Sequence, residues 1–143
     1  MKGVSMEGFP FVCPIAVRFA DIDAMNHVNN AVLVTFLETA RVALWRERFG
    51  FAGAASSIPV IVARVAVDYR APIELLDEVR IGLGVRSIGR SSFTIAYRVE
   101  ASGRLAAEAE TVQVMFDYSA SKPVPIDGAM RARLEALRLP AAA

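Results

Sequence analysis

A long apolar helix followed by a series of alternating strands most constrains the fold of this chain. Residues 31–49 have a helical pattern whose first two-thirds is apolar on nearly every face, which is typical of a helix enclosed by other structure. Gly50 follows at the position where helices favour a glycine C-cap. A strand-like run, residues 11–20, precedes the helix. The helix is therefore expected to lie inside the domain, with strands around it.

Four further runs after the helix have strand patterns. Apolar residues occupy every second position in residues 79–85 and again in residues 93–99, which is the pattern of half-buried antiparallel strands. Gly89 marks the turn between these two runs. Residues 59–70 form a strand before them and residues 105–118 form one after them. The chain therefore predicts a meander of neighbouring strands.

The order of these elements predicts an α+β architecture. An apolar helix followed by a meander implies one antiparallel sheet curled around that helix. Near Thr111 the alternation slips, which predicts a bulge or burial on both sides of the last strand. Residues 126–139 have the pattern of a short amphipathic helix. The length of 143 residues fits a single domain, 1–143, with its core at about residues 11–120.

Composition excludes several classes of partner. The chain is 55% hydrophobic and 22% charged, a globular composition whose apolar excess hints at surface buried in an oligomer. A formal net charge of +1 and the lack of a Lys/Arg block argue against nucleic acid as a partner. No run approaches the ~18 apolar residues of a membrane span. Cys13 is the only cysteine, so no internal disulfide can form, and a reducing, cytoplasmic location is expected.

A polar cluster lies between the first strand and the long helix. Its members include two carboxylates and the only histidine of the chain: Asp21, Asp23, Asn26, His27, Asn29 and Asn30. Free backbone N–H groups and the helix dipole at such a helix start stabilise anions and developing oxyanions. Asn and Asp are also favoured helix caps, but a cap needs only one residue. The cluster therefore indicates function, and a carboxylate beside a helix start suits acyl chemistry.

Five segments carry a family resemblance. They are RFADID (18–23), HVNN (27–30), LETAR (37–41), VDYRAP (67–72) and GRSS (89–92). With these segments the chain resembles the 4-hydroxybenzoyl-CoA thioesterase family, which has the hot-dog fold, a curved five-stranded sheet wrapped around a central helix. The resemblance spans about residues 11–120 and implies hydrolysis of acyl-CoA thioesters.

The resemblance assigns roles within the polar cluster. It implies that Asp23, the second carboxylate of the Asp-x-Asp pair, is catalytic, either as a general base on water or as a nucleophile that forms a mixed anhydride. His27 matches a functional histidine of plant acyl-carrier-protein thioesterases, and it either orients water or the substrate carbonyl or caps the loop. We expect Asn30 to cap the helix with its amide reaching the site, and backbone N–H groups of residues 28–30 to polarise the thioester oxygen. Asp21 is expected to bind backbone N–H groups and shape the turn.

Two positions depart from the related sequences. Met25 stands where the plant enzymes carry an asparagine, so their full catalytic arrangement cannot be transferred, and Leu33 stands where many relatives have a tyrosine. An acyl-thioester hydratase or dehydratase is one alternative, but its signature places four residues between Asp and His, whereas Asp23 and His27 have three between them. A non-catalytic acyl-CoA-binding protein is the other alternative.

Recognition of CoA needs cations for its phosphates. We expect Arg90, with Ser91 and Ser92 at the start of a strand, to bind this part of the substrate; the reserve candidates are Arg64, Arg86 and Arg131. The family implies CoA thioesters, or less often acyl-carrier-protein thioesters, as substrates. It also implies a homodimer or homotetramer with two active sites at each dimer interface. No cofactor is expected, and one histidine and one cysteine far apart in sequence do not make a metal site.

Overall fold

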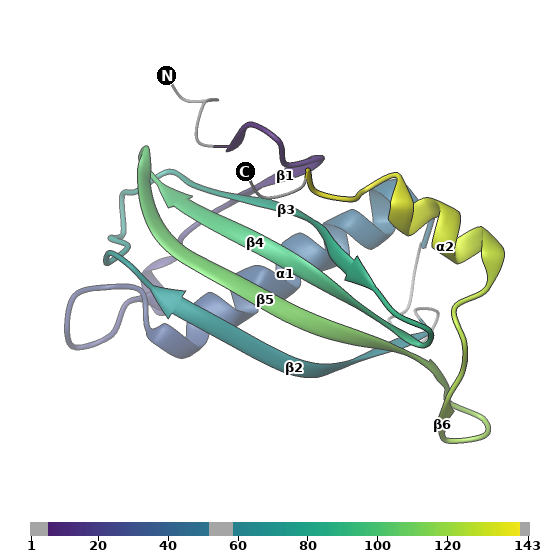
Figure 1. Cartoon of the computed structure of the whole chain (residues 1–143). Helices are drawn as coiled ribbons and strands as arrows, with labels where there is room; N and C mark the ends of the chain where they lie inside the picture. The colour runs from purple at the N-terminus through teal and green to yellow at the C-terminus, as the bar shows by residue number, and fades with distance from the viewer. Residues whose placement is uncertain (1–5, 52–58, 141–143) are drawn as a thin grey trace.

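A curved antiparallel sheet lies across one long helix, as Figure 1 shows for the computed structural model, which describes residues 6–51 and 59–140. The strands, in spatial order, are β1 (Phe11–Ile15), β3 (Val79–Ile88), β4 (Ser92–Ala101), β5 (Arg104–Asp117) and β2 (Val60–Tyr69). The helix is α1 (Asn30–Phe49). The predicted α+β architecture, with five antiparallel strands around a central helix, is confirmed.

The ends of several elements differ from the predicted ones. The first strand is shorter than predicted, because the chain leaves the sheet after Ile15 and forms a 3-10 turn, η2 (Phe19–Asp21). A two-residue strand, β6 (Lys122–Pro123), pairs with β5 and was not predicted. The C-terminal helix α2 (Gly128–Glu135) is shorter than the amphipathic pattern predicted. Figure 1 shows α2 at the opposite end of the sheet from the start of α1.

The inner face of the sheet and one face of α1 form the core. The buried apolar residues of α1 recur every three or four positions: Leu33, Phe36, Leu37, Ala40, Leu44, Trp45 and Phe49. The Trp45 ring meets the Phe93 ring of β4 edge-on, with centroids 5.8 Å apart. Gly50 ends α1 in the left-handed conformation, as predicted. Burial of this face fixes the axis of α1, and therefore the position of its N-terminus, against the sheet.

One side of α1 stays uncovered, contrary to the expectation of a fully enclosed helix. Val34 and Val42 are 37% and 38% exposed, because α1 lies closest to β1 and β3 and leaves the β2 side open. The edge strand β2 is exposed as well, with Val62 at 38% and Val65 at 42%. The register between β2 and β5 shifts at Val62/Arg64. The sequence predicted an irregularity near Thr111 of β5. The observed register shift lies opposite that region, on the neighbouring strand β2.

The outer face of β3 is covered by the segments at both ends of the domain. A Cβ on Gly84 would stand 2.8 Å from Leu139 Cδ2 and 2.8 Å from Pro10 Cδ. Real Cβ atoms essentially never come this close to a neighbour. Glycine at this position therefore lets the two segments pack directly on the sheet.

We predict that Gly84→Ala lowers the free energy of unfolding by about 1–3 kcal/mol, the usual cost of overpacking. Gly128→Ala is the matched control, because a Cβ on Gly128 meets nothing within 4 Å and alanine favours a helix. Urea unfolding of both variants measures the difference. Equal stabilities for the two variants would show that the terminal segments do not pack on β3 in solution.

Candidate active site

A tight loop between η2 and α1 presents the Asp23 carboxylate. The Asp23 N–H donates to the His27 carbonyl at 3.1 Å, and the Asn26 N–H donates to the Asp23 carbonyl at 2.9 Å. Asn26 has φ +67°, a left-handed conformation that asparagine tolerates better than most residues. Ile22 and Val28 form an isolated antiparallel bridge that closes the loop. The loop is therefore fixed by its own backbone.

Asn29 connects Asp23 to the start of α1. Its Nδ2 donates to Asp23 Oδ2 at 3.0 Å, and its Oδ1 accepts from the Ala31 N–H at 2.8 Å. The Met25 N–H donates to the other oxygen, Asp23 Oδ1, at 2.9 Å. Asn29 is thus the N-cap, and the prediction that Asn30 caps the helix is wrong. The reason is that Asn29 keeps a non-helical backbone while Asn30 already belongs to the helix.

Most backbone N–H groups at this helix start have acceptors. The Val28 N–H donates to the Ile73 carbonyl at 2.8 Å, and the Asn29 N–H donates to the Asp21 carbonyl at 3.0 Å. Within the residues that the structure describes, the Asn30 N–H has no acceptor. Of the N–H groups expected to polarise a thioester oxygen, Asn30 therefore offers the free one.

Asp21 supports the loop and is withdrawn from solvent, with 1% exposure. It accepts hydrogen bonds from the Arg18 N–H at 2.8 Å and from Arg18 Nη2 at 2.9 Å. The hydrogen bond from the Arg18 guanidinium holds the pKa of the Asp21 carboxyl below its usual value, although burial opposes this shift. As expected, Asp21 binds a backbone N–H and shapes the turn, so the two carboxylates of the pair have different environments.

A cavity of about 310 Å³ opens beside this loop. Its walls come from the loop before α1, the start of α1, the end of β2 with the loop that follows it, and β5. The lining residues include His27, Asn30, Leu33, Tyr69, Ile73 and Ala106. The Tyr69 hydroxyl donates to the Asn30 carbonyl at 2.6 Å. The half-buried His27 ring has no hydrogen bond within the described part of the chain, so the loop-capping alternative finds no support there. His27 and Asn30 thus share a cavity wall, and Asp23 lies on the adjoining loop.

The sequence predicted no individual role for three residues of this site. Asn29 contacts Asp23, and Tyr69 contacts Asn30. Ile73 contacts the backbone between them, at Val28. Asn29 and Tyr69 lie in segments that carry the family resemblance, which was the available signal. For Ile73 the contact is made by its backbone carbonyl, so its side chain gave no signal.

The predicted CoA-binding residues lie far from Asp23 in one subunit. Ser92 pairs with Val114 of β5, whereas Tyr69, at the cavity, pairs with Ala107 of the same strand. Seven residues of β5 separate the two positions, which corresponds to about 23 Å. Figure 1 shows the turn between β3 and β4, which holds Arg90, at the other end of the sheet from the start of α1. The fold of a single chain therefore does not bring Arg90, Ser91 and Ser92 to the Asp23 loop.

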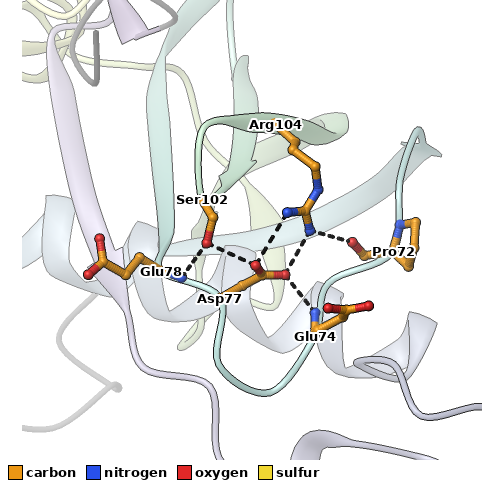
Figure 2. A network of polar contacts seen from close by, with 6 residues as sticks. All are labelled: Pro72, Glu74, Asp77, Glu78, Ser102 and Arg104. Carbon is orange, nitrogen blue, oxygen red and sulfur yellow. Dashed lines mark hydrogen bonds and ion pairs between the residues drawn. The ribbon is translucent and has the colours of Figure 1, made fainter.

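A network of polar contacts holds the loop that follows β2 (Figure 2). Arg104 Nη2 donates to Asp77 Oδ2 at 2.7 Å and to the Pro72 carbonyl at 3.1 Å. Asp77 also accepts hydrogen bonds from the Glu74 N–H at 2.8 Å and from Ser102 Oγ at 2.8 Å. The hydrogen bond from Arg104, aided by these donors, lowers the pKa of Asp77 from 3.8 to about 2 although burial opposes the shift.

Neither a metal site nor a membrane helix is found in the described ranges 6–51 and 59–140. No three His, Cys, Asp or Glu side chains there are grouped so that they could hold a metal ion. No helix in these ranges is long and apolar enough to cross a membrane.

A family model and two named relatives match this sequence. Residues 17–134 match the model of the thioesterase-like superfamily. The long-chain acyl-CoA thioesterase FadM of Escherichia coli (strain K12) is 29% identical over 124 residues, which cover 85% of this chain and 94% of FadM. The acyl-CoA thioester hydrolase YbgC of Escherichia coli O157:H7 is 32% identical over 116 residues, covering 79% of this chain and 87% of YbgC.

Among solved structures, a thioesterase from Thermus thermophilus complexed with coenzyme A and Zn is similar in fold and sequence. It superimposes with a TM-score of 0.83 at 38% identity, covering 92% of this chain and 96% of the other. The PA5185 protein from Pseudomonas aeruginosa strain PAO1 gives a TM-score of 0.84 at 30% identity, with coverage of 96% and 97%.

The lowered pKa of Asp77 predicts a pH dependence of stability. The folded state binds the Asp77 proton more weakly than the unfolded state, so the ionised carboxylate stabilises the fold above pH 3.8. That contribution is lost as the pH falls toward about 2. The stability difference between the wild type and Asp77→Asn should therefore shrink over this window, as measured by denaturant unfolding at each pH. A difference that stays constant down to pH 2 would contradict the lowered pKa.

Proposed function

Because this chain belongs to the thioesterase-like superfamily, we propose that it hydrolyses acyl-CoA thioesters to the free acid and CoA. One observation carries the proposal. A carboxylate, Asp23, is held by the side chain of Asn29. The next residue, Asn30, has a backbone N–H at the N-terminus of α1 that finds no acceptor among residues 6–51 and 59–140. A group that can activate water thus lies beside a donor for an oxyanion, at the edge of a cavity with apolar lining residues such as Leu33 and Ile73.

Asp23 serves as the general base or as the nucleophile. As a base it takes a proton from water while the oxygen attacks the thioester carbonyl. As a nucleophile it displaces the thiolate to give a mixed anhydride, which water then cleaves. Thiols have a pKa near ~8.5, so the CoA thiolate leaves without a strong general acid. The hydrogen bonds from Met25 and Asn29 fix the carboxylate in one orientation for either route.

The Asn30 N–H stabilises the developing negative charge on the carbonyl oxygen. It lies at the positive end of the α1 dipole, and a donor of this kind is worth about 2.7–4 kcal/mol in the transition state. The hydrogen bond from Tyr69 to the Asn30 carbonyl holds this first residue of α1 against β2. His27, on the same cavity wall, orients water or the substrate carbonyl.

The names of the relatives favour hydrolysis over the two alternatives. FadM and YbgC are named as a thioesterase and a thioester hydrolase. A hydratase would add water to a double bond without releasing thiol, and a binding protein would hold acyl-CoA without turnover. Thiol release from a panel of short, long and aromatic acyl-CoAs separates the three functions and identifies the acyl preference.

A homodimer built on the edge strand β2 completes the site. One edge of β2 is unpaired in the described part of the chain, and the partly exposed Val62 and Val65 line a surface hollow together with Val34 of α1. A second copy that pairs its own β2 antiparallel would extend the sheet and cover these valines. Exposed apolar surface and a free strand edge support this mode of association.

Such a dimer also brings the predicted CoA-binding turn to the cavity. Antiparallel pairing sets the Tyr69 end of one β2 beside the Val60 end of the other. Val60 pairs with Met115 on β5, next to the start of β4. The turn that holds Arg90 in the partner subunit then lies about three strand spacings, ~14 Å, from the Tyr69 end of the first subunit's β2. Within one subunit, the separation between that end and the turn is about 23 Å along the strands. CoA, or an acyl-carrier-protein arm, would then extend from one subunit's cavity to the other subunit's arginine.

We predict that Asp23→Asn lowers turnover by at least ~10²-fold and leaves the fold intact, because the amide keeps the shape but cannot accept a proton. Asp21→Asn is the matched control, since Asp21 is buried and bonded to Arg18. It should cost less turnover and more thermal stability. Thiol-release assays and thermal unfolding measure the two effects. The reverse order of effects would show that the roles of the two carboxylates are exchanged.

We predict that Arg90→Ala raises KM for acyl-CoA with little change in kcat, because a guanidinium on a phosphate aids binding remote from the scissile bond. A short N-acetylcysteamine thioester lacks the nucleotide and should be hydrolysed as before. Mixing Asp23→Asn and Arg90→Ala subunits should restore activity at low acyl-CoA, since a mixed dimer holds one intact site. A fully active monomer in light scattering, or no restoration on mixing, would contradict the shared site.

A further inference from the structure

We propose that the ion pair between Arg104 and Asp77 positions the Asp23 loop, and that it acts through the backbone of Ile73. Arg104 and Asp77 are positioning residues, which do not touch the substrate. This inference rests on the proposed function, because it assigns the ion pair a part in the turnover of that site. Its structural half, the fixing of the loop, can be measured without any substrate.

The ion pair holds the residues on both sides of Ile73. On one side, Arg104 Nη2 donates to the Pro72 carbonyl at 3.1 Å. On the other side, Asp77 Oδ2 accepts from the Glu74 N–H at 2.8 Å. Figure 2 shows both contacts converging from one guanidinium and one carboxylate. Because the two side chains are bonded to each other at 2.7 Å, the Pro72–Glu74 backbone is held from both flanks.

Ile73 passes this constraint to the catalytic loop. Its carbonyl accepts the hydrogen bond from the Val28 N–H at 2.8 Å. Val28 lies between Asp23 and Asn30, the two groups that act on the thioester in the proposed mechanism. Ile73 itself is 5% exposed and lines the cavity. A shift of its carbonyl therefore moves the segment that sets the distance between Asp23 and the Asn30 N–H.

The sheet supplies the fixed reference for this arrangement. Ser102, in the turn between β4 and β5, donates through Oγ to Asp77 Oδ1 at 2.8 Å and accepts from the Glu78 N–H at 3.0 Å. Arg104 is the first residue of β5. The Ala106 carbonyl of β5 accepts from the Arg70 N–H at 2.8 Å, at the other end of the same loop. The loop from 70 to 78 is thus tied to the sheet at both ends, and Ile73 lies between the ties.

Simple charge attraction does not explain this arrangement. The Arg104 side chain is 45% exposed, so solvent weakens its attraction to Asp77, whose side chain is 10% exposed. Here each partner also bonds the backbone of the loop, so the pair defines the position of the loop. Catalysis is sensitive to position, because a misplacement of 1 Å costs on the order of 10²-fold in rate.

Arg104→Lys and Asp77→Asn test the proposal. Lysine keeps the charge but has no planar fork, so it cannot bond both Asp77 oxygens as Arg104 does through Nη1 at 3.3 Å and Nη2 at 2.7 Å. Asparagine keeps the shape of Asp77 without the charge. Glu135→Gln is the matched control, because Glu135 pairs with Arg138 at 2.8 Å in the C-terminal segment, away from the cavity. Amide hydrogen exchange at Val28 reports the loop directly, and steady-state kinetics on acyl-CoA and the N-acetylcysteamine thioester report turnover.

In both Arg104→Lys and Asp77→Asn, the hydrogen of the Val28 amide should exchange with solvent at least ~10-fold faster than in the wild type. The kcat of both variants should fall ~10-fold or more, with little change in KM for either substrate. Glu135→Gln should change neither quantity. Unchanged Val28 exchange and unchanged kcat in a destabilised Arg104→Lys protein would overturn the proposal and leave the ion pair a purely structural role. If the wild type releases no thiol, the proposed function fails, but Val28 exchange still decides whether the ion pair fixes the loop.

Discussion

The side chain of Asn29 is the contact on which the proposed site depends. One amide caps α1 through Ala31 and holds the Asp23 carboxylate at the same time. The start of the helix and the Asp23 carboxylate therefore cannot move independently. Because the helix axis is itself fixed by a buried apolar face, the position of Asp23 relative to the Asn30 N–H follows from the core of the protein. The site is thus preorganised by packing that lies outside it.

The sheet fixes the same site from the other side. The Tyr69 hydroxyl holds Asn30, and the Ile73 carbonyl holds Val28. Both residues lie at the end of β2 or just beyond it, where the loop is tied back to β5. The cavity lies between these two supports, α1 on one side and the end of β2 on the other. An acyl group in it would meet apolar walls, with the polar groups gathered at the start of α1.

Periodicity made the fold predictable, whereas single contacts were not. The apolar spacing of α1 and the alternation in β3 and β4 report burial directly, so these elements were predicted to within a few residues. Asn29 and Asn30 have the same side chain, and only the backbone angles decide which of them caps the helix. The bond between Arg104 and Asp77 joins residues 27 positions apart, which no local pattern encodes. Ser92 and Tyr69 pair with positions of β5 that are seven residues apart, so the distance of Arg90 from the Asp23 loop follows from strand register rather than from any local pattern.

A crystal structure with a non-hydrolysable acyl-CoA analogue, in which a methylene replaces the thioester sulfur, tests the central claim most directly. We predict that the analogue's carbonyl oxygen accepts a hydrogen bond from the Asn30 N–H at about 2.7–3.1 Å. The carbonyl carbon should lie next to the Asp23 carboxylate, directly or through one water. A carbonyl bound elsewhere, with Asp23 and the Asn30 N–H both facing away from it, would contradict the account.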